Sequence, residues 1–250
     1  MNDDIKDAIA DHAIAEYPRE AVGLVVLKDG EEVYIPCRNI ALNPRTDFAL
    51  HPRDFAHAED AGQIVALAHS HPDETARPRT QDKVTCEKSD IAQWIIVSIS
   101  KRIDGSIGVD EWCEFGPTGF IAPLLSRTFV HGVLDCYALG RDWYRIERGI
   151  VLPDIARADE WWNDGRSNLY IENYERAGFS NVGTDVELQV GDALLMQIRS
   201  KNGVPNHCGV YLGDGAFIHH FYGQLSRRES WGGLWARSLQ AVLRYVGDQK

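Results

Sequence analysis

The chain has 250 residues and a formal net charge of −11, with hydrophobic residues at 44% and charged residues at 25%. This balance is typical of globular protein with ample core material, in one large domain or two of ordinary size. The acidic charge argues against a nucleic-acid or anionic-membrane partner, and no apolar run is long enough to span a bilayer. The acidic N-terminus argues against Sec-type export, and five cysteines without a regular framework favour a reducing cytoplasm.

The first half is predicted to be mixed α/β. Helices are expected at residues 5–17, 53–61 and 80–89, the last with Thr80 as its N-cap, and strands at residues 21–27, 32–36, 64–68 and 93–100. A glycine- and proline-rich segment at residues 116–119 then breaks the pattern. We therefore expect a domain junction at about residues 114–127 and two domains, residues 1–115 and 125–250.

The second half is predicted to begin with a helix and continue into a sheet. The first helix carries Cys136 and ends near Gly149. Residues 154–181 are rich in Trp, Tyr and Asn and mostly helical in pattern, and strands are expected at residues 192–198, 208–212, 216–219 and 242–246. Helix first and sheet afterwards is the order of a papain-like α+β domain.

The sequence around Cys136 has the residues of a cysteine-peptidase site. Asp135 and Cys136 open the helix, so the field of the helix N-terminus favours the thiolate. His207 precedes a strand and could face the sulfur, while His219 on the next strand could hold His207 in the required tautomer. The alternative is an inert core cysteine, but the helix start and the two histidines together favour catalysis.

Asp135-Cys136 and the segment from His207 to His219 resemble the NlpC-type cysteine peptidases of cell-wall hydrolysis. The resemblance implies that Cys136 is the nucleophile, that His207 is the base and that His219 orients it. The spacing between the two histidines matches the family. Its oxyanion tyrosine lies upstream of the cysteine, and the sequence places no residue in that role.

A second constellation in the first half has the pattern of a metal site. His69 and His71 are two residues apart at the end of a predicted strand, so both imidazoles point to one face. Asp82 follows in the first turn of the next predicted helix. Two histidines and one carboxylate with an open fourth position are typical of catalytic zinc, and Glu20 is the candidate base that activates water. A solvated surface loop is the alternative for the histidine pair alone.

The segment from Pro18 to Leu24, followed by both histidines and Asp82, resembles the JAMM (MPN) metalloprotease motif over roughly residues 1–113. The resemblance implies that the histidines and the aspartate bind Zn²⁺ and that Glu20 is the acid/base. One position departs from the motif, because Arg79 stands where the family has an oxyanion-stabilising serine. The adjacent Thr80 could substitute, or the arginine could act as a cationic stabiliser.

A JAMM domain followed by an NlpC-type domain resembles the tail tip assembly protein K family of lambda-like phages, prophages and gene transfer agents. Residues 159–162, 168–170 and 204–207 also look like that family's sequence. The fold implied is α+β, with a JAMM/MPN-like α/β domain and a papain-like NlpC-type α+β domain. The function implied is a tail tip component, made in the host cytoplasm, that contacts other tail tip proteins and cuts peptidoglycan peptide stems during DNA passage.

Three alternatives stay open at this stage. Trp161, Trp162, Tyr170 and Tyr174 could line the substrate groove, although such aromatic residues are more often core. The protein could instead be a structural tail tip component with vestigial active sites, for which Arg79 is the best support. A third interpretation is an assembly protease that trims another tail protein through its metal domain.

Overall fold

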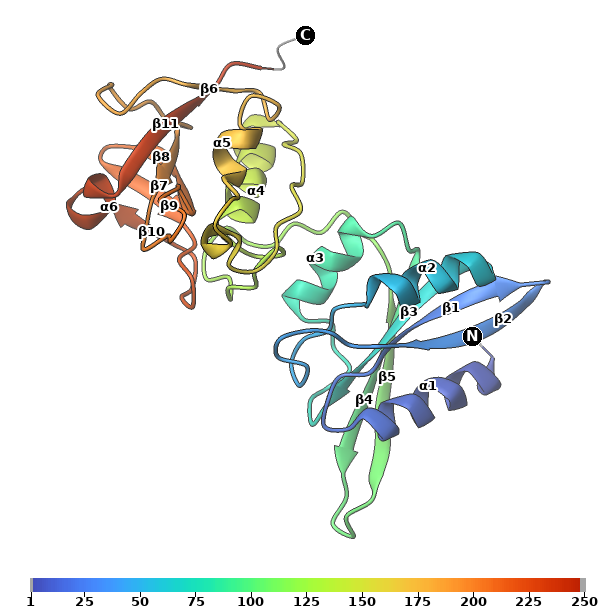
Figure 1. Cartoon of the computed structure of the whole chain (residues 1–250). Coiled ribbons are helices and arrows are strands. Elements are labelled where there is room, and N and C mark those ends of the chain that lie inside the picture. Colours follow the sequence, from blue (N-terminus) through green and yellow to red (C-terminus); the bar gives the residue numbers. More distant parts are fainter. Residues whose placement is uncertain (1, 248–250) are drawn as a thin grey trace. The chain divides into compact units, whose positions relative to one another are not determined.

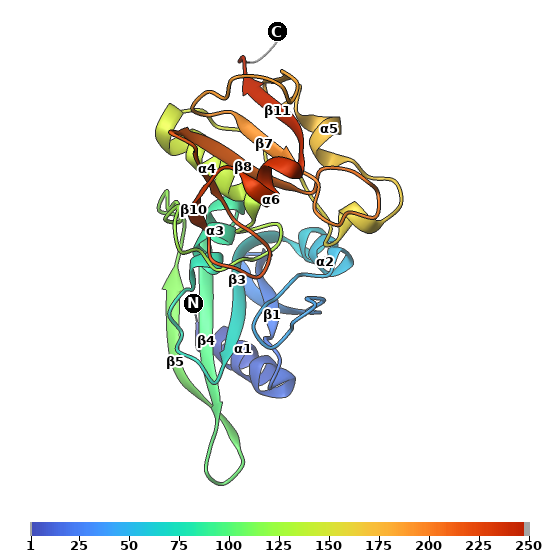
Figure 2. The same ribbon diagram turned by 90° about the vertical axis from the view of Figure 1, so that its left-hand side faces the viewer.

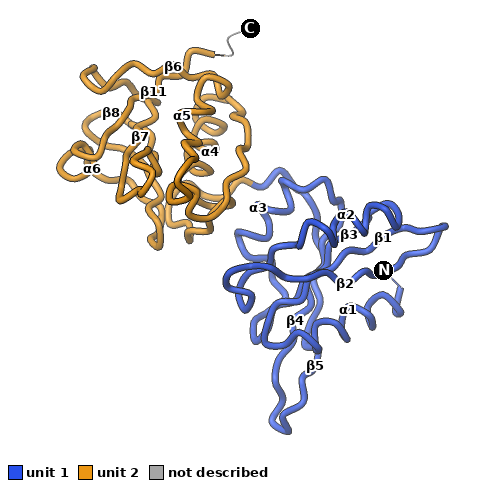
Figure 3. Tube along the Cα trace, in the orientation of Figure 1, with its two compact units in different colours: residues 1–120 blue, residues 121–250 orange. Residues whose placement is uncertain are grey.

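The computed structural model describes residues 2–247, which form helices and strands joined by loops (Figure 1). The chain divides into two compact units, residues 1–120 and residues 121–250, hereafter unit 1 and unit 2 (Figure 3). Over the described residues, no helix combines the length and the apolar character needed to cross a membrane. The predicted α+β class is confirmed.

Unit 1 contains a five-stranded sheet with helices on both faces. Its strands are β1 (Val22–Lys28), β2 (Glu31–Cys37), β3 (Gln63–Pro72), β4 (Gln93–Lys101) and β5 (Ile107–Phe115), in the order β2-β1-β3-β4-β5. Only β3 and β4 of this sheet pair in parallel, through a connection that carries a helix. The helices are α1 (Asp3–Glu16), α2 (Pro52–Ala61) and α3 (Thr80–Lys88). The paired β4 and β5 extend as a long hairpin beyond the rest of the sheet (Figure 2).

Alternation along the strands explains the layers of unit 1. Val25 of β1 faces the buried side of α1, whereas Leu24 faces a second cluster that includes Ala58 of α2 and Cys86 of α3. Successive strand residues point to opposite faces, so a continuously apolar strand needs a helix on each side. The sheet is thereby buried on both faces, and the end of β3 is held rigidly between them.

Unit 2 packs helices against a six-stranded antiparallel sheet. Its strands are β6 (Phe179–Asn181), β7 (Ala193–Met196), β8 (His207–Gly213), β9 (Ala216–His219), β10 (Arg227–Ser230) and β11 (Leu239–Tyr245), in the order β10-β9-β8-β7-β11-β6. The helices are α4 (Cys136–Arg148), the 3₁₀ turn η1 (Trp161–Asn163), α5 (Leu169–Asn173) and α6 (Gly233–Arg237). Leu139, Trp143 and Tyr144 form the buried face of α4, which packs on Val210 of β8 and Ile218 of β9.

Two details of the expected secondary structure are wrong. Residues 154–181 are not mostly helical, because their only helices are η1 and the five-residue α5, and they end in strand β6. The aromatic residues of this segment pack in the unit without forming the stripe of a long helix. Gly165 and Gly178 adopt positive φ angles, which end regular structure. The N-cap of α3 is Arg79 rather than Thr80, and its backbone amide donates to the Asp82 carboxylate at 2.6 Å. Strands β5, β6 and β10 and helix α6 were not predicted.

Candidate cysteine active site and candidate metal centre

Cys136 is the first residue of α4, and Asp135 is the helix N-cap. The Asp135 carboxylate accepts hydrogen bonds from the backbone amides of Ala138 at 2.9 Å and Gly132 at 2.8 Å. It also pairs with the buried guanidinium of Arg157, whose Nε lies 2.6 Å from Oδ2. These bonds fix the loop that enters the helix and place the half-buried thiol at the positive end of the helix dipole.

His207 and His219 come together across two paired strands. The structure places His207 as the first residue of β8 and His219 as the last of β9, which runs antiparallel to it. Nε2 of His207 lies 3.0 Å from Nδ1 of His219, and both side chains are buried. Hydrogen bonding from the Cys208 thiol, which outweighs the opposing effect of burial, and hydrogen bonding from His207 hold the pKa of Cys136 well below the usual range of a thiol.

Tyr170 is a site residue that the sequence did not assign. Its hydroxyl, contributed by α5, lies 3.3 Å from Sγ of Cys136. Burial raises the pKa of Tyr170 well above its ordinary value, so the hydroxyl keeps its proton and acts as a donor. The only sequence signal was its place in the aromatic-rich stretch, because Tyr170 follows Cys136 by 34 positions and nothing in that spacing marks the contact.

The cysteine lies in a cleft of about 240 Å³. The residues that line it are largely aromatic or apolar, with a few polar groups, and include Phe129, Cys136, Trp161, Trp162, Tyr170, Asn206, His207 and Phe221. Three of the four aromatic residues proposed for a groove therefore face the cleft, whereas Tyr174 lines a smaller cavity of about 60 Å³. A mostly apolar cleft with a few convergent polar groups is the usual form of a small-ligand site.

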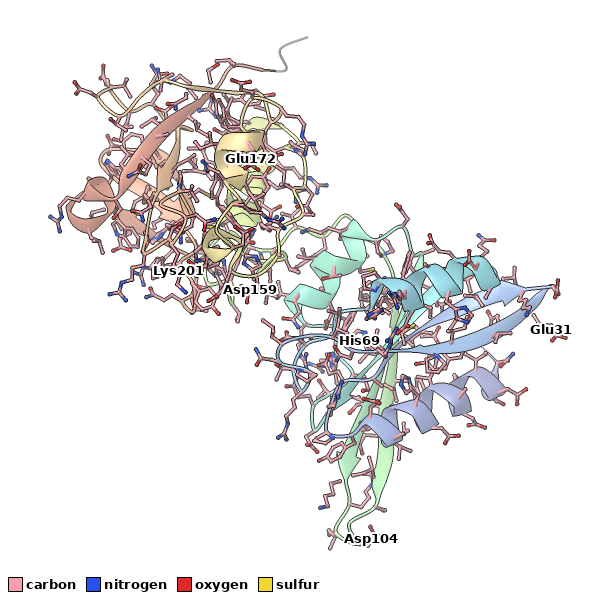
Figure 4. The ribbon with its side chains drawn as sticks, viewed as in Figure 1. Glu31, His69, Asp104, Asp159, Glu172 and Lys201 are labelled. Atoms are coloured by element: carbon pink, nitrogen blue, oxygen red, sulfur yellow. The ribbon has the colours of Figure 1, made fainter. Side chains whose placement is uncertain are left out.

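In unit 1 the structure brings His69, His71 and Asp82 together. Both histidines end β3 on the same face, and Asp82 lies in the first turn of α3. Nε2 of His69 lies 3.6 Å from Oδ1 of Asp82, and Nε2 of His71 lies 3.5 Å from Oδ2. All three side chains are buried, and His69 lies in the interior of unit 1, far from the hairpin tip at Asp104 (Figure 4).

This geometry fits a tetrahedral metal ion. Ligand atoms about 2.0–2.1 Å from zinc stand roughly 3.3–3.5 Å apart in a tetrahedral shell. One ligand atom from each of the three side chains lies within 4.8 Å of the other two. His71 donates from Nδ1 to the carbonyl of Thr75 at 2.8 Å, which leaves the Nε2 lone pair for a ligand bond. Neither ring nitrogen of His69 has a hydrogen-bond partner among the described residues. Burial lowers the pKa of His69, so its ring stays neutral and able to ligate.

Glu20 lies beside this cluster but is held by Arg79. The guanidinium Nη1 of Arg79 lies 2.7 Å from Oε1 of Glu20 and 2.8 Å from the carbonyl oxygen of Thr46, and Nε donates to Glu74 at 3.0 Å. Burial, opposed by Arg79, raises the pKa of Glu20 to about 7. Arg79, which stands where the motif has serine, thus reaches Glu20, whereas the adjacent Thr80 is exposed.

Comparisons with known proteins identify both units. Residues 2–106 match the family model described as prokaryotic homologs of the JAB domain, and residues 126–244 match the NlpC/P60 family. The protein is thus a JAB-type unit followed by an NlpC/P60 unit, as the two sites indicate. The chain belongs to the tail tip assembly protein K family, which confirms the resemblance seen in the sequence.

Two named relatives carry this assignment. Tail tip assembly protein K of Escherichia phage N15 is 39% identical over 240 residues, or 96% of this chain and 93% of that protein. The protein of the same name from Escherichia phage lambda is 38% identical over 194 residues, or 78% and 88%. A crystal structure of an NLP/P60-family protein from Staphylococcus aureus is 20% identical, with a TM-score of 0.35 over 49% of this chain and 38% of that one.

Proposed function

We propose that this protein is a tail tip component whose unit 2 hydrolyses peptide bonds of peptidoglycan and so clears the way for DNA. The observation that carries the proposal is the convergence of Cys136, the His207–His219 pair and Tyr170 at one cleft. The assembly role follows from the naming of its relatives. We further propose that it is made in the host cytoplasm, where its five free thiols stay reduced, and joins other tail proteins at the virion tip.

The chemistry that fits this arrangement is acyl transfer through a thioester. The Cys136 thiolate attacks a peptide carbonyl carbon, the C–S bond forms, and His207 gives its proton to the departing amine as the C–N bond breaks. Water then attacks the thioester, His207 takes its proton, and the carboxylate product leaves the regenerated thiol. His219 holds His207 in place through both steps.

A digestion experiment tests this function. Purified peptidoglycan is incubated with the protein in the presence of reductant and EDTA, and the released muropeptides are identified by mass spectrometry. We expect new peptide fragments that disappear after thiol alkylation but persist in EDTA, because unit 2 needs a thiolate and no metal ligand. The absence of any release by the unmodified protein would refute the murein hydrolase and favour the structural role.

Tyr170 is positioned to stabilise the oxyanion of this reaction. Replacement of Tyr170 by Phe removes one buried hydroxyl and keeps the ring, so kcat is expected to fall about 100-fold with little change in KM. Tyr174→Phe, in the neighbouring cavity, is the matched control and should keep full activity. Steady-state rates of muropeptide release measure both, and equal rates in the two variants would exclude the role.

We also propose that His69, His71 and Asp82 hold Zn²⁺ in unit 1. A bound zinc ion would polarise a peptide carbonyl and lower the pKa of water. Glu20 is the residue placed to move a proton there, and its ion pair with Arg79 must open or shift for that purpose. The trimming of another tail protein is the second candidate function, and it is supported by the fit of these three side chains to a tetrahedral ion.

Zinc binding gives a direct measurement for unit 1. The purified chain is expected to bind one zinc ion, and His69→Ala should weaken binding by at least about 100-fold because one of three protein ligands is lost. His57→Ala is the matched control, since His57 is exposed on α2. Competition with a chelating dye reports the affinity. An affinity that His69→Ala leaves unchanged would place the metal elsewhere.

A further inference from the structure

The pair of histidines in unit 2 continues to a third side chain on the next strand. Strand β10 pairs antiparallel with β9, which places Arg227 opposite His219 and brings Glu229 close to the same ring. Oε2 of Glu229 lies 3.0 Å from Nε2 of His219 and 2.9 Å from Nε of Arg227. The buried imidazole of His219 is thus held between His207 on one side and a carboxylate on the other.

The direction of these hydrogen bonds follows from the acceptor at the end. A carboxylate only accepts, so Nε2 of His219 carries the proton. Burial, together with the nearby His207, lowers the pKa of His219 to about 4, so at neutral pH this ring is neutral and its Nδ1 is an acceptor. The 3.0 Å bond between the rings is therefore donated by Nε2 of His207. Nδ1 of His207 is then left unprotonated, as a base toward Cys136 requires.

Aromatic packing keeps the chain of bonds in this geometry. Phe217 stacks on His219 with ring centroids 4.5 Å apart, and Trp235 meets the same ring edge-on at 4.6 Å. Trp235 also packs on His207 at 5.8 Å. The rings cannot rotate without breaking these contacts, so the protonation pattern is set by the group at the end of the chain, which is Glu229.

We propose that Glu229 is a positioning residue that fixes the tautomers of both histidines and stabilises the positive charge that His207 gains when Cys136 ionises. This rests on the proposed function of the cysteine site. Glu229 acts through His219 and does not touch the thiol. Its role is comparable to that of the carboxylate in a Ser-His-Asp triad, except that a second imidazole stands between it and the base.

A change of charge at Glu229 has a defined effect on the pH profile. The titratable or charged groups around the thiol and the two rings are Asp135 and Cys136 at the start of α4, Tyr170 on α5, Cys208 on β8, His220 after β9, and Arg227 on β10. Without the carboxylate, the thiolate–imidazolium pair loses stabilisation. The thiolate then forms at higher pH, so the acid limit of the active range moves up.

The test compares Glu229→Gln, which keeps the size and an acceptor oxygen, with Glu229→Asp, which keeps the charge. Alkylation of Cys136 by iodoacetamide is followed by peptide mass spectrometry across pH. The acid limb of the alkylation profile should shift up by about one pH unit in Glu229→Gln and stay near the wild-type position in Glu229→Asp. The kcat for muropeptide release should fall at least about 10-fold in Glu229→Gln at nearly constant KM. Glu187→Gln, at an exposed site of the same unit, is the control.

Identical alkylation profiles in wild type and Glu229→Gln would overturn the proposal. Alkylation needs no substrate, so it tests Glu229 separately from the proposed activity. If the acid limb of alkylation shifts in Glu229→Gln but the wild-type protein releases no muropeptides, the role of Glu229 is supported and only peptidoglycan as the substrate is refuted. Should Glu229→Gln fail to fold, ¹⁵N NMR of the wild-type histidines gives the answer. Protons on Nε2 of both His207 and His219 support the proposal, and a proton on Nδ1 of either neutral ring contradicts it.

Discussion

Alanine at Cys136 is expected to reduce muropeptide release by about 10⁴-fold or more, because the nucleophile is lost. The neighbouring Cys208 thiol does not replace it, since its contact with Cys136 and its burial raise its pKa well above the ordinary value. The thiol is half-buried, and its removal leaves the Asp135 cap intact, so the midpoint of thermal unfolding should stay close to that of the wild type. Cys113→Ala, on β5 of unit 1, is the matched control and should digest peptidoglycan at the wild-type rate. Release is quantified by chromatography of the soluble fragments.

An experiment on phage particles distinguishes an enzymatic role from a purely structural one. Tails that carry Cys136→Ala should assemble normally and lose cell-wall digestion, since the substitution changes the site and leaves the fold. Undiminished digestion by this variant would show that Cys136 is not the nucleophile. Tails that fail to assemble would instead show that the cysteine matters for structure.

Asp135→Ala is expected to cost about 3–5 kcal/mol of the free energy of unfolding of unit 2. The side chain of Arg157 is only 7% exposed and would be left without its charged partner in the core, and α4 would lose its N-cap. Urea denaturation followed by tryptophan fluorescence measures the loss. Asp185→Ala, an exposed aspartate in the same unit, should change stability by less than about 0.5 kcal/mol.

The ion pair of Asp135 and Arg157 also predicts how this loss of stability depends on pH. Burial opposes ionisation of Asp135, but Arg157 and the two backbone amides hold its pKa below the ordinary value. A depressed folded pKa contributes stability that is present above the unfolded value of about 3.9 and is lost as the pH falls through the folded value. The difference between wild type and Asp135→Ala should therefore shrink below about pH 4. A difference that grows on acidification would contradict the ion pair.

The sequence predicted the parts of the sites that lie in short, regular segments. His69 and His71 share a face because strand residues alternate, and Asp82 follows at the start of the next helix. Cys136 opens an amphipathic helix, and His207 begins a strand, so local pattern is enough to find them. Their roles in catalysis and metal binding remain predictions.

The residues that the sequence missed are brought in by tertiary structure. Tyr170 reaches Cys136 from a five-residue helix that has no periodic signature, and Glu229 reaches His219 from a short strand with exposed neighbours. Neither contact has a characteristic spacing, because intervening loops set the distance. The sequence did not decide whether Arg79 is a cationic stabiliser or a sign of a vestigial site, and only the fold shows that its guanidinium turns toward Glu20.

The cleft around Cys136 limits how a group can approach the thiol. Aromatic side chains, among them Trp161, Trp162 and Phe221, line its space of about 240 Å³. A group that reaches the thiol must therefore lie against these rings, so we expect the lining, as well as the thiol, to select what binds there.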